Sequence, residues 1–303
     1  MKDVHAMAPR EGQLDLHRVG VTGIKKPLAV QRADRVVTLS TTFAVDVDLP
    51  ASRKGSDLSR NAELLAEIID STATTPVESL ESACLSIAKE LLQRHQYATQ
   101  ARVDASATYF RIRGISEKRQ TYEDYKILAS AIACRRSDGQ VPEVRRTIGA
   151  EAVGMTACPC AMEVAREILE GEFPLLKDKS FASFPIISHN QRNRTRLRFE
   201  VDPKNDIEVD RILDAIEAAQ SSPTYSILKR RDEAQVVLNA HRNPKFVEDV
   251  MRDLLSGVVH RFAELPDDAI VIAETVSEES IHKYDVSASH RMTMGELRKL
   301  VGD

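Results

Sequence analysis

The chain has 303 residues, of which 42 % are hydrophobic and 29 % are charged, and this composition is typical of a folded globular protein. A formal net charge of −4 argues against a general nucleic-acid or anionic-membrane surface, so a polyanion would need a local site. No apolar run reaches the roughly 20 residues of a membrane span, and the first residues lack the apolar core of a signal peptide. We therefore expect a cytoplasmic protein with reduced cysteines that binds neither nucleic acid nor membrane.

In the first half of the chain, hydrophobic periodicity predicts strands and helices in a simple order. Alternating residues predict strands at 16–30 and 35–49, and helical spacing predicts helices at 62–70 and 76–95. Residues 101–113 alternate again, and residues 122–134 favour a further strand, although a helix is also compatible with them. The order is strand, strand, helix, helix, strand, strand.

The second half repeats this order with longer insertions. Strands are predicted at 145–156, 194–201 and 269–276, and helices at 162–169 and 209–220. Asn243 and Pro244 resemble the start of another helix, with a capping amide followed by proline. The doubled pattern predicts an α+β fold of two similar modules, each an antiparallel sheet with helices on one face. We place the boundary near Gln140, which gives modules at 1–140 and 141–303.

Two cysteines lie one proline apart in the stretch GMTACPCAME, residues 154–163. One intervening residue is too few for a zinc knuckle and suits a disulfide poorly, so Cys158 and Cys160 are either incidental or work with distant partners. A buried, inert thiol is the simpler interpretation. Against it, Pro159 forces an extended backbone at Cys158, and a helix start behind it would favour thiolate at Cys160.

Two polar stretches further along carry candidate functional side chains. SHNQRNR, residues 188–194, contains His189, a potential metal ligand, and Arg192, which could bind phosphate; a solvated loop is the alternative. LKRRDEAQVVLNAHRNPKFVED, residues 228–249, contains Glu233, His241 and Glu248, the last of these one or two turns into the helix that follows. The alternative here is a charged surface connection between two helices.

A third polar stretch, SEESIHKYD at residues 277–285, follows the last predicted strand. Glu279 and His282 would point to opposite faces of a regular strand, so a shared site would require a bulge or the end of the strand. A charged edge strand is the alternative. The spacing of these dispersed side chains does not by itself show that they converge.

Taken in order, five motifs resemble the prokaryotic GTP cyclohydrolase IB family: MTACPCA, SHNQR, SSPTYSILKRRDE, NPKFVEDVMRD and EESIH. VDLPASRKGSDLSR in the first half resembles that family too, so the likeness runs from about Arg18 to the C-terminus. GMTACPCA, RKGSDLSRN and NAHRNPKFVEDV are more similar to the archaeal MptA-type branch, which serves methanopterin synthesis, than to the bacterial folate-type branch.

This resemblance implies a fold, an assembly and a reaction. The fold is a tandem pair of tunnelling-fold modules that forms homodimers or homotetramers with active sites at interfaces. The reaction opens the imidazole ring of GTP with a metal-activated water, releases formate and yields a dihydropterin. In the archaeal branch the implied metal is Fe(II) and the product is 7,8-dihydroneopterin 2′,3′-cyclic phosphate. The bacterial branch retains the triphosphate and accepts several divalent metals, so Zn or Mn is also compatible.

The resemblance also assigns roles to individual residues of this sequence. It implies that the metal ligands are Cys158, His189, Glu233 and His282. Glu279 would hold the guanine edge, Glu248 would act as a general acid/base, and Cys160 would lie beside the site. The residues implied for the triphosphate are Arg192, Arg53, Lys54, Ser59 and Arg60, some of them acting across an interface.

Two other functions remain open at this point. A tunnelling-fold protein could bind a purine or pterin without turnover. A related nitrile reductase of queuosine synthesis would use a cysteine nucleophile and NADPH, but the several cyclohydrolase motifs argue against it.

Overall fold

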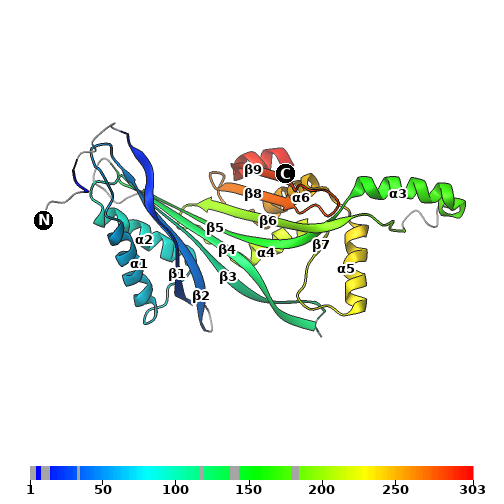
Figure 1. Ribbon diagram of the computed structural model, residues 1–303, viewed down its shortest axis with the longest axis horizontal. Coiled ribbons are helices and arrows are strands. Elements are labelled where there is room, and N and C mark those ends of the chain that lie inside the picture. Colours follow the sequence, from blue (N-terminus) through cyan, green and yellow to red (C-terminus); the bar gives the residue numbers. More distant parts are fainter. Residues whose placement is uncertain are drawn as a thin grey trace. The chain divides into compact units, whose positions relative to one another are not determined.

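The computed structural model describes residues 5–7, 14–32, 35–116, 119–136, 143–178 and 184–302. In chain order the elements are β1 (Leu16–Gln31), β2 (Val36–Leu49), α1 (Leu58–Thr72), α2 (Leu80–Arg94), β3 (Gln100–Ser116), β4 (Arg119–Cys134), β5 (Glu143–Ala157), α3 (Pro159–Glu172), a 3₁₀ turn (Pro174–Lys177), β6 (Asn190–Val201), α4 (Val209–Ala219), β7 (Ser222–Pro223), α5 (Arg230–Arg242), α6 (Val247–Arg261), β8 (Ile270–Ser277), β9 (Val286–Thr293) and α7 (Met294–Val301). The predicted strands are therefore present, and 122–134 is a strand rather than a helix (Figure 1).

Hydrogen-bonded neighbours in the sheet follow the order β1-β2-β3-β4-β5-β6-β8-β9, and β7 pairs with β5. The β1–β2, β2–β3, β5–β7 and β8–β9 pairs are antiparallel. The chain divides into two compact units: residues 1–109, 126–148 and 200–206 form the first, and residues 110–125, 149–199 and 207–303 form the second. Because the units exchange segments of chain, a module boundary near residue 140 stays a prediction.

In the first unit, one face of β1, β2 and β3 packs against α1 and α2 (Figure 1). Alternation places Phe43, Val45 and Val47 of β2 in the core at 1 % exposure or less. Leu64 and Leu65 of α1 are equally buried, as helical spacing predicts. The hydrophobic surface removed from water on this face is what holds the helices to the sheet.

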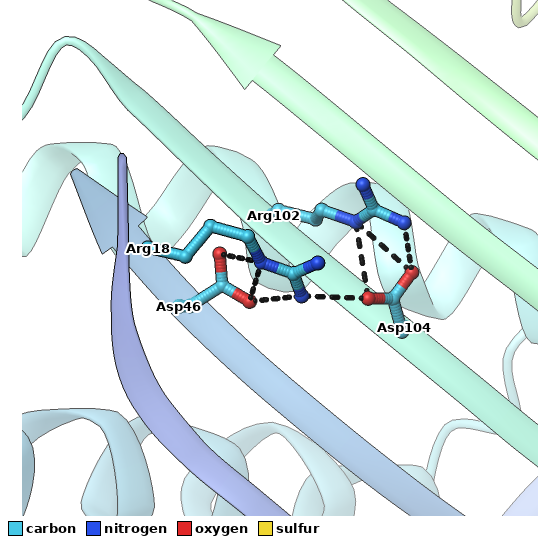
Figure 2. A network of polar contacts seen from close by, with 4 residues as sticks. All are labelled: Arg18, Asp46, Arg102 and Asp104. Atoms are coloured by element: carbon cyan, nitrogen blue, oxygen red, sulfur yellow. Dashed lines mark hydrogen bonds and ion pairs between the residues drawn. The ribbon is translucent and has the colours of Figure 1, made fainter. Parts of the chain in front are cut away.

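The opposite face of β1, β2 and β3 carries paired charges (Figure 2). Arg18 donates to Asp46 at 2.6 Å and to Asp104 at 3.0 Å, and Arg102 donates to the same Asp104 at 3.0–3.1 Å. Gly20 lies opposite Asp46, where a Cβ atom would collide with the backbone of β2. Asp46 is buried, whereas Arg18 is about half exposed, so this face carries partly buried ion pairs and the helices cover the other face.

The second unit has the same two-sided organisation. α4 and α6 pack together, and α6 contacts β8. Phe199 of β6 and Phe262 at the end of α6 are fully buried, with ring centroids 4.6 Å apart. On the other face, Arg198 of β6 donates to Glu274 of β8 at 2.8 Å. Helices on one face and charges on the other confirm the predicted α+β class.

Phe199→Ala is expected to destabilise the folded chain by about 3–5 kcal/mol, because it leaves a cavity in place of a fully buried ring. Denaturant titration of the free energy of unfolding measures this loss. Leu300→Ala is the matched control, because that side chain is 73 % exposed and should change the free energy by less than about 0.5 kcal/mol. Equal effects of the two substitutions would contradict this assignment of the core.

The structure differs from the sequence-based expectations, or adds to them, at three points in the second half of the chain. Residues 230–242 form helix α5 rather than a surface connection; only Val236, Ala240 and His241 of this helix are buried, too narrow a stripe to detect. Asn243 ends α5 instead of starting the next helix, and its amide donates to the carbonyl of Gln220. β9 and α7 were not predicted. Among the described residues, no helix is both long and apolar enough to cross a bilayer.

Candidate functional site

Hydrogen bonds to backbone atoms bring the CPC motif and the SHNQR motif together in the second unit. The Cys158 N–H donates to the His189 carbonyl at 3.1 Å, and the Ser188 hydroxyl donates to the Cys158 carbonyl at 2.6 Å. His241 of α5 adds a third segment, because its Nε2 lies 3.2 Å from the Ser188 carbonyl. Hydrogen bonds to main-chain atoms therefore bring segments 30 residues apart together at the start of α3.

Cys158 owes its position to the proline that follows it. It is the N-cap of α3 with φ −73° and ψ 118°, and Pro159 is the first helical residue. This is the extended backbone expected before proline. Cys160 lies one residue further into the helix and is exposed. The two thiols thus differ in setting, and only Cys158 is bonded through its backbone to His189.

His189, Gln191 and Glu279 form a partly buried polar cluster. His189 Nδ1 lies 2.9 Å from Gln191 Oε1 and 3.7 Å from a carboxylate oxygen of Glu279. Gln191 Nε2 lies 3.2 Å from the other oxygen of that carboxylate. The His189 and Glu279 side chains are 12 % and 9 % exposed, so their polar atoms have limited access to water. Burial and mutual hydrogen bonds distinguish these side chains from those of a fully solvated loop.

His282 approaches the same cluster from beyond the end of β8. Its ring centroid lies 6.4 Å from that of His189, edge to face, and it stacks on Tyr284 at 5.0 Å. β8 ends at Ser277, so strand alternation does not determine the direction of the Glu279 or His282 side chain. The end of the strand, one of the two conditions for a shared site of Glu279 and His282, is therefore present.

The side-chain types fit a divalent transition metal, because thiolate, imidazole and carboxylate are ligands for iron, zinc and manganese. Gln191 contacts Nδ1 of His189, so only Nε2 would be available to a metal. In the described ranges, however, no three His, Cys, Asp or Glu side chains lie close enough together to hold an ion as they stand. The four-ligand set stays a prediction.

The remaining predicted residues of this half lie outside the polar cluster. Glu233 is exposed in the first turn of α5. Glu248 is exposed and is the second residue of α6, earlier in that helix than the sequence suggested. Arg192 is exposed on β6, where its carbonyl accepts from the Glu278 N–H at 2.9 Å.

The four residues predicted to contact phosphate in the first unit surround the start of α1. Lys54, Ser59 and Arg60 are exposed, and the Arg53 guanidinium lies 4.1 Å from the Tyr97 ring centroid. Arg53 Nε is buried with no hydrogen-bond partner among the described residues. The Asp57 carboxylate at the N-cap of α1 lies 3.7 Å from Arg53 and 3.3 Å from Arg60, so an anion at this helix start would share these guanidinium groups with Asp57. The positive end of the helix dipole would favour the anion.

A buried hydrogen-bond network lies next to the segment that precedes α1. His95 Nε2 lies 2.6 Å from Asn61 Oδ1, and its Nδ1 lies 3.0 Å from the Tyr97 hydroxyl, which contacts Ser56 at 2.8 Å. Burial lowers the pKa of His95, which favours the neutral ring. Asn61 then accepts from Nε2, and Tyr97 donates to Nδ1.

Sequence reasoning gave no role to Gln191, Thr156 and Ser277, which link the ends of three strands. Thr156 lies on β5 and Ser277 on β8, with hydroxyls 3.2 Å apart, and Gln191 Nε2 lies 3.1 and 3.2 Å from them. The only available signal was that Gln191 follows His189 by two residues, the spacing of side chains on one face of a strand.

Comparison with known proteins gives a family and close relatives. Residues 1–288 match the model of the family described as type I GTP cyclohydrolase folE2. GTP cyclohydrolase MptA of Methanococcoides burtonii is 41% identical over 98% of this chain and 95% of that protein. The MptA of Methanosarcina mazei is 42% identical over 99% and 96%, and that of Methanothermobacter thermautotrophicus is 41% identical over 93% and 91%.

Among solved structures, a uricase from Bacillus fastidious matches with a TM-score of 0.51 at 8% identity and covers 94% of this chain and 95% of that one. At this identity the likeness concerns the fold alone. It confirms the predicted α+β architecture of tandem tunnelling-fold modules.

Proposed function

Since the chain belongs to the type I GTP cyclohydrolase folE2 family and is a GTP cyclohydrolase of the MptA type, we propose that its reaction takes place at the polar cluster around His189. The observation that carries this proposal is the convergence of Cys158, His189, Gln191, Glu279 and His282 from separate strand ends. The reaction would open the imidazole ring of GTP and release formate.

The metal would be held by Cys158, His189, Glu233 and His282. When bound, the ion would supply an activated water for attack at C8 of the purine. Fe(II) is the proposed metal, and Zn or Mn would suit the same ligand types. Two observations support the proposal: Cys158 is hydrogen-bonded to His189 through the backbone, and the Nε2 atom of His189 is left free by Gln191. Glu233 would have to approach from α5, whose His241 already contacts the carbonyl of Ser188.

Glu279 is proposed to recognise guanine. An ionised carboxylate accepts the N1–H and the exocyclic N–H of guanine as a charge-assisted pair, and adenine offers no such pair of donors. The carboxylate is only 9 % exposed, so the hydrogen bonds would form with little competition from water. One carboxylate oxygen is held by Gln191 at 3.2 Å, which fixes its direction.

Proton transfer and phosphate binding would use residues outside the cluster. Glu248, at the exposed start of α6, is the proposed general acid/base that delivers a proton to the departing ring nitrogen, with Cys160 next to the site. Arg192 is proposed to bind the triphosphate. The proposed partners from the first unit are Arg53, Lys54, Ser59 and Arg60, supplied by one copy or another of the chain in a homodimer or homotetramer.

We propose a cytoplasmic enzyme with modules at 1–140 and 141–303, in which the second module carries most of the metal site. All four proposed ligands fall within its range. The proposed product is 7,8-dihydroneopterin 2′,3′-cyclic phosphate, as in methanopterin synthesis. Dihydroneopterin triphosphate, the folate-type product, is the alternative.

Anaerobic incubation of the Fe(II)-loaded protein with GTP tests this function. Formate release and, after oxidation, a fluorescent pterin are expected, and mass analysis of the product separates a cyclic phosphate from a triphosphate. Parallel reactions with Zn, Mn and no metal show which ion supports turnover. Guanine-nucleotide binding without formate under every metal condition would instead favour a non-catalytic purine-binding protein.

A further inference from the structure

Gln191 is the hub of the polar cluster, with contacts to four side chains of the second unit. Its Oε1 lies 2.9 Å from His189 Nδ1. Its Nε2 lies 3.2 Å from Glu279, 3.1 Å from Thr156 and 3.2 Å from Ser277. These partners come from the end of β5, from the segment before β6 and from the end of β8.

The orientation of this amide follows from the chemistry of its neighbours. The Glu279 carboxylate, when ionised, only accepts hydrogen bonds, so the NH₂ group of Gln191 must face it. The carbonyl oxygen of the amide then faces His189 and can only accept, so the neutral imidazole carries its proton on Nδ1. This tautomer leaves the lone pair of His189 on Nε2.

The remaining hydrogen of the NH₂ group serves the two hydroxyls. Thr156 and Ser277 lie 3.2 Å apart, so one hydroxyl can accept from Gln191 and donate to the other. This shared contact secures the amide against rotation. Loss of one hydroxyl would leave the contacts to His189 and Glu279 in place.

We propose that Gln191 is a positioning residue that couples the metal ligand His189 to the guanine-binding residue Glu279. The inference rests on the proposed function. The amide sets the His189 tautomer in which Nε2 can bind a metal, and it holds the Glu279 carboxylate in the direction that guanine requires. Only a side chain that both donates and accepts can perform both tasks, because glutamate would repel Glu279. An apolar side chain would leave only the 3.7 Å approach of His189 Nδ1 to Glu279, with no amide to orient either group.

The test compares Gln191→Met, which preserves length but removes the hydrogen bonds, with the wild type. Affinity for Fe(II) and for Zn, measured by chelator competition without nucleotide, is expected to fall about 10- to 100-fold, as is typical when a ligand loses its supporting hydrogen bond. The KM for GTP is expected to stay raised at saturating metal, and the preference for GTP over inosine triphosphate should shrink. Gln191→Glu should lose more GTP affinity than metal affinity.

Two controls separate positioning from folding. Asn193 lies two residues further along β6 in a similar buried network with Thr195 and Thr275, and the contacts of this network include none of the proposed metal ligands. Asn193→Leu should lower the unfolding midpoint while the folded protein keeps its metal affinity and KM. Thr156→Val should change the metal affinity and the KM for GTP by less than about threefold, since the Ser277 hydroxyl can still accept from Gln191 Nε2.

The outcomes distinguish the two proposals. A wild type that binds metal and converts GTP, together with a Gln191→Met variant of unchanged metal affinity and KM, overturns the role of Gln191 alone. A variant that loses only stability does the same. A wild type that neither retains metal nor releases formate overturns the proposed function and this inference with it.

Discussion

Cys158→Ala is expected to abolish metal retention and formate release, the largest effect of any single substitution in the cluster. Even residues that only support a ligand cost about 10- to 100-fold in metal affinity when replaced, so loss of the thiolate itself should exceed that range. The fold should survive, because the backbone of Cys158 carries the contacts to His189 and Ser188, and alanine retains them.

Cys160→Ala is the matched control for this substitution. The second thiol lies one residue into α3 and is exposed, so its loss should leave metal content unchanged and turnover within a few-fold of the wild type. Metal per protein after desalting, measured by elemental analysis, and formate release are the two readouts. Full metal content in Cys158→Ala would remove Cys158 from the proposed ligands.

The sequence predicted the strands well because their signal is local. Alternation in β2 and β6 records directly which side chains face the core, and Phe43 and Phe199 are fully buried as that pattern requires. α5 was missed because its buried stripe is limited to Val236, Ala240 and His241 on an otherwise charged helix. Hydrophobic periodicity cannot predict a helix in which so few residues face the core.

The candidate site was predicted in part, through motifs rather than spacing. Cys158 and His189 are adjacent because Ala157 ends β5 and Asn190 begins β6, and no local rule gives that pairing across 30 residues. The position of Glu279 beyond a strand end followed from strand periodicity. Gln191 could not have been predicted, since its importance lies in four contacts from three segments.

The helix start at Asn243 illustrates a second limit of sequence reasoning. Asparagine followed by proline suits a helix N-terminus, but the Asn243 amide instead donates to the carbonyl of Gln220 in the tight passage from α5 to α6. This later helix start changes the position of a candidate site residue. α6 begins at Val247, so Glu248 lies in its first turn. A carboxylate at this end of a helix is stabilised by the dipole.

Glu279→Gln is expected to lower kcat/KM for GTP by about 10²- to 10⁴-fold, because two charge-assisted hydrogen bonds of about 1.5–3 kcal/mol each are lost. The new amide would also present N–H donors to the N–H donors of guanine. Metal content should persist, since Glu279 is not among the proposed ligands. This combination separates Glu279→Gln from Cys158→Ala, which should lose the metal.

Glu278→Gln is the adjacent control, because Glu278 is 40 % exposed and pairs with Arg194 at 2.9 Å on the charged face of the sheet. It should keep kcat/KM within about threefold of the wild type, as for most exposed ion pairs. Inosine triphosphate, which lacks the exocyclic amine, sharpens the comparison: the wild type should strongly prefer GTP, whereas Glu279→Gln should convert both nucleotides about equally poorly. A variant that kept the wild-type preference would show that another group reads the guanine edge, with Glu279 limited to orienting Gln191 and His189.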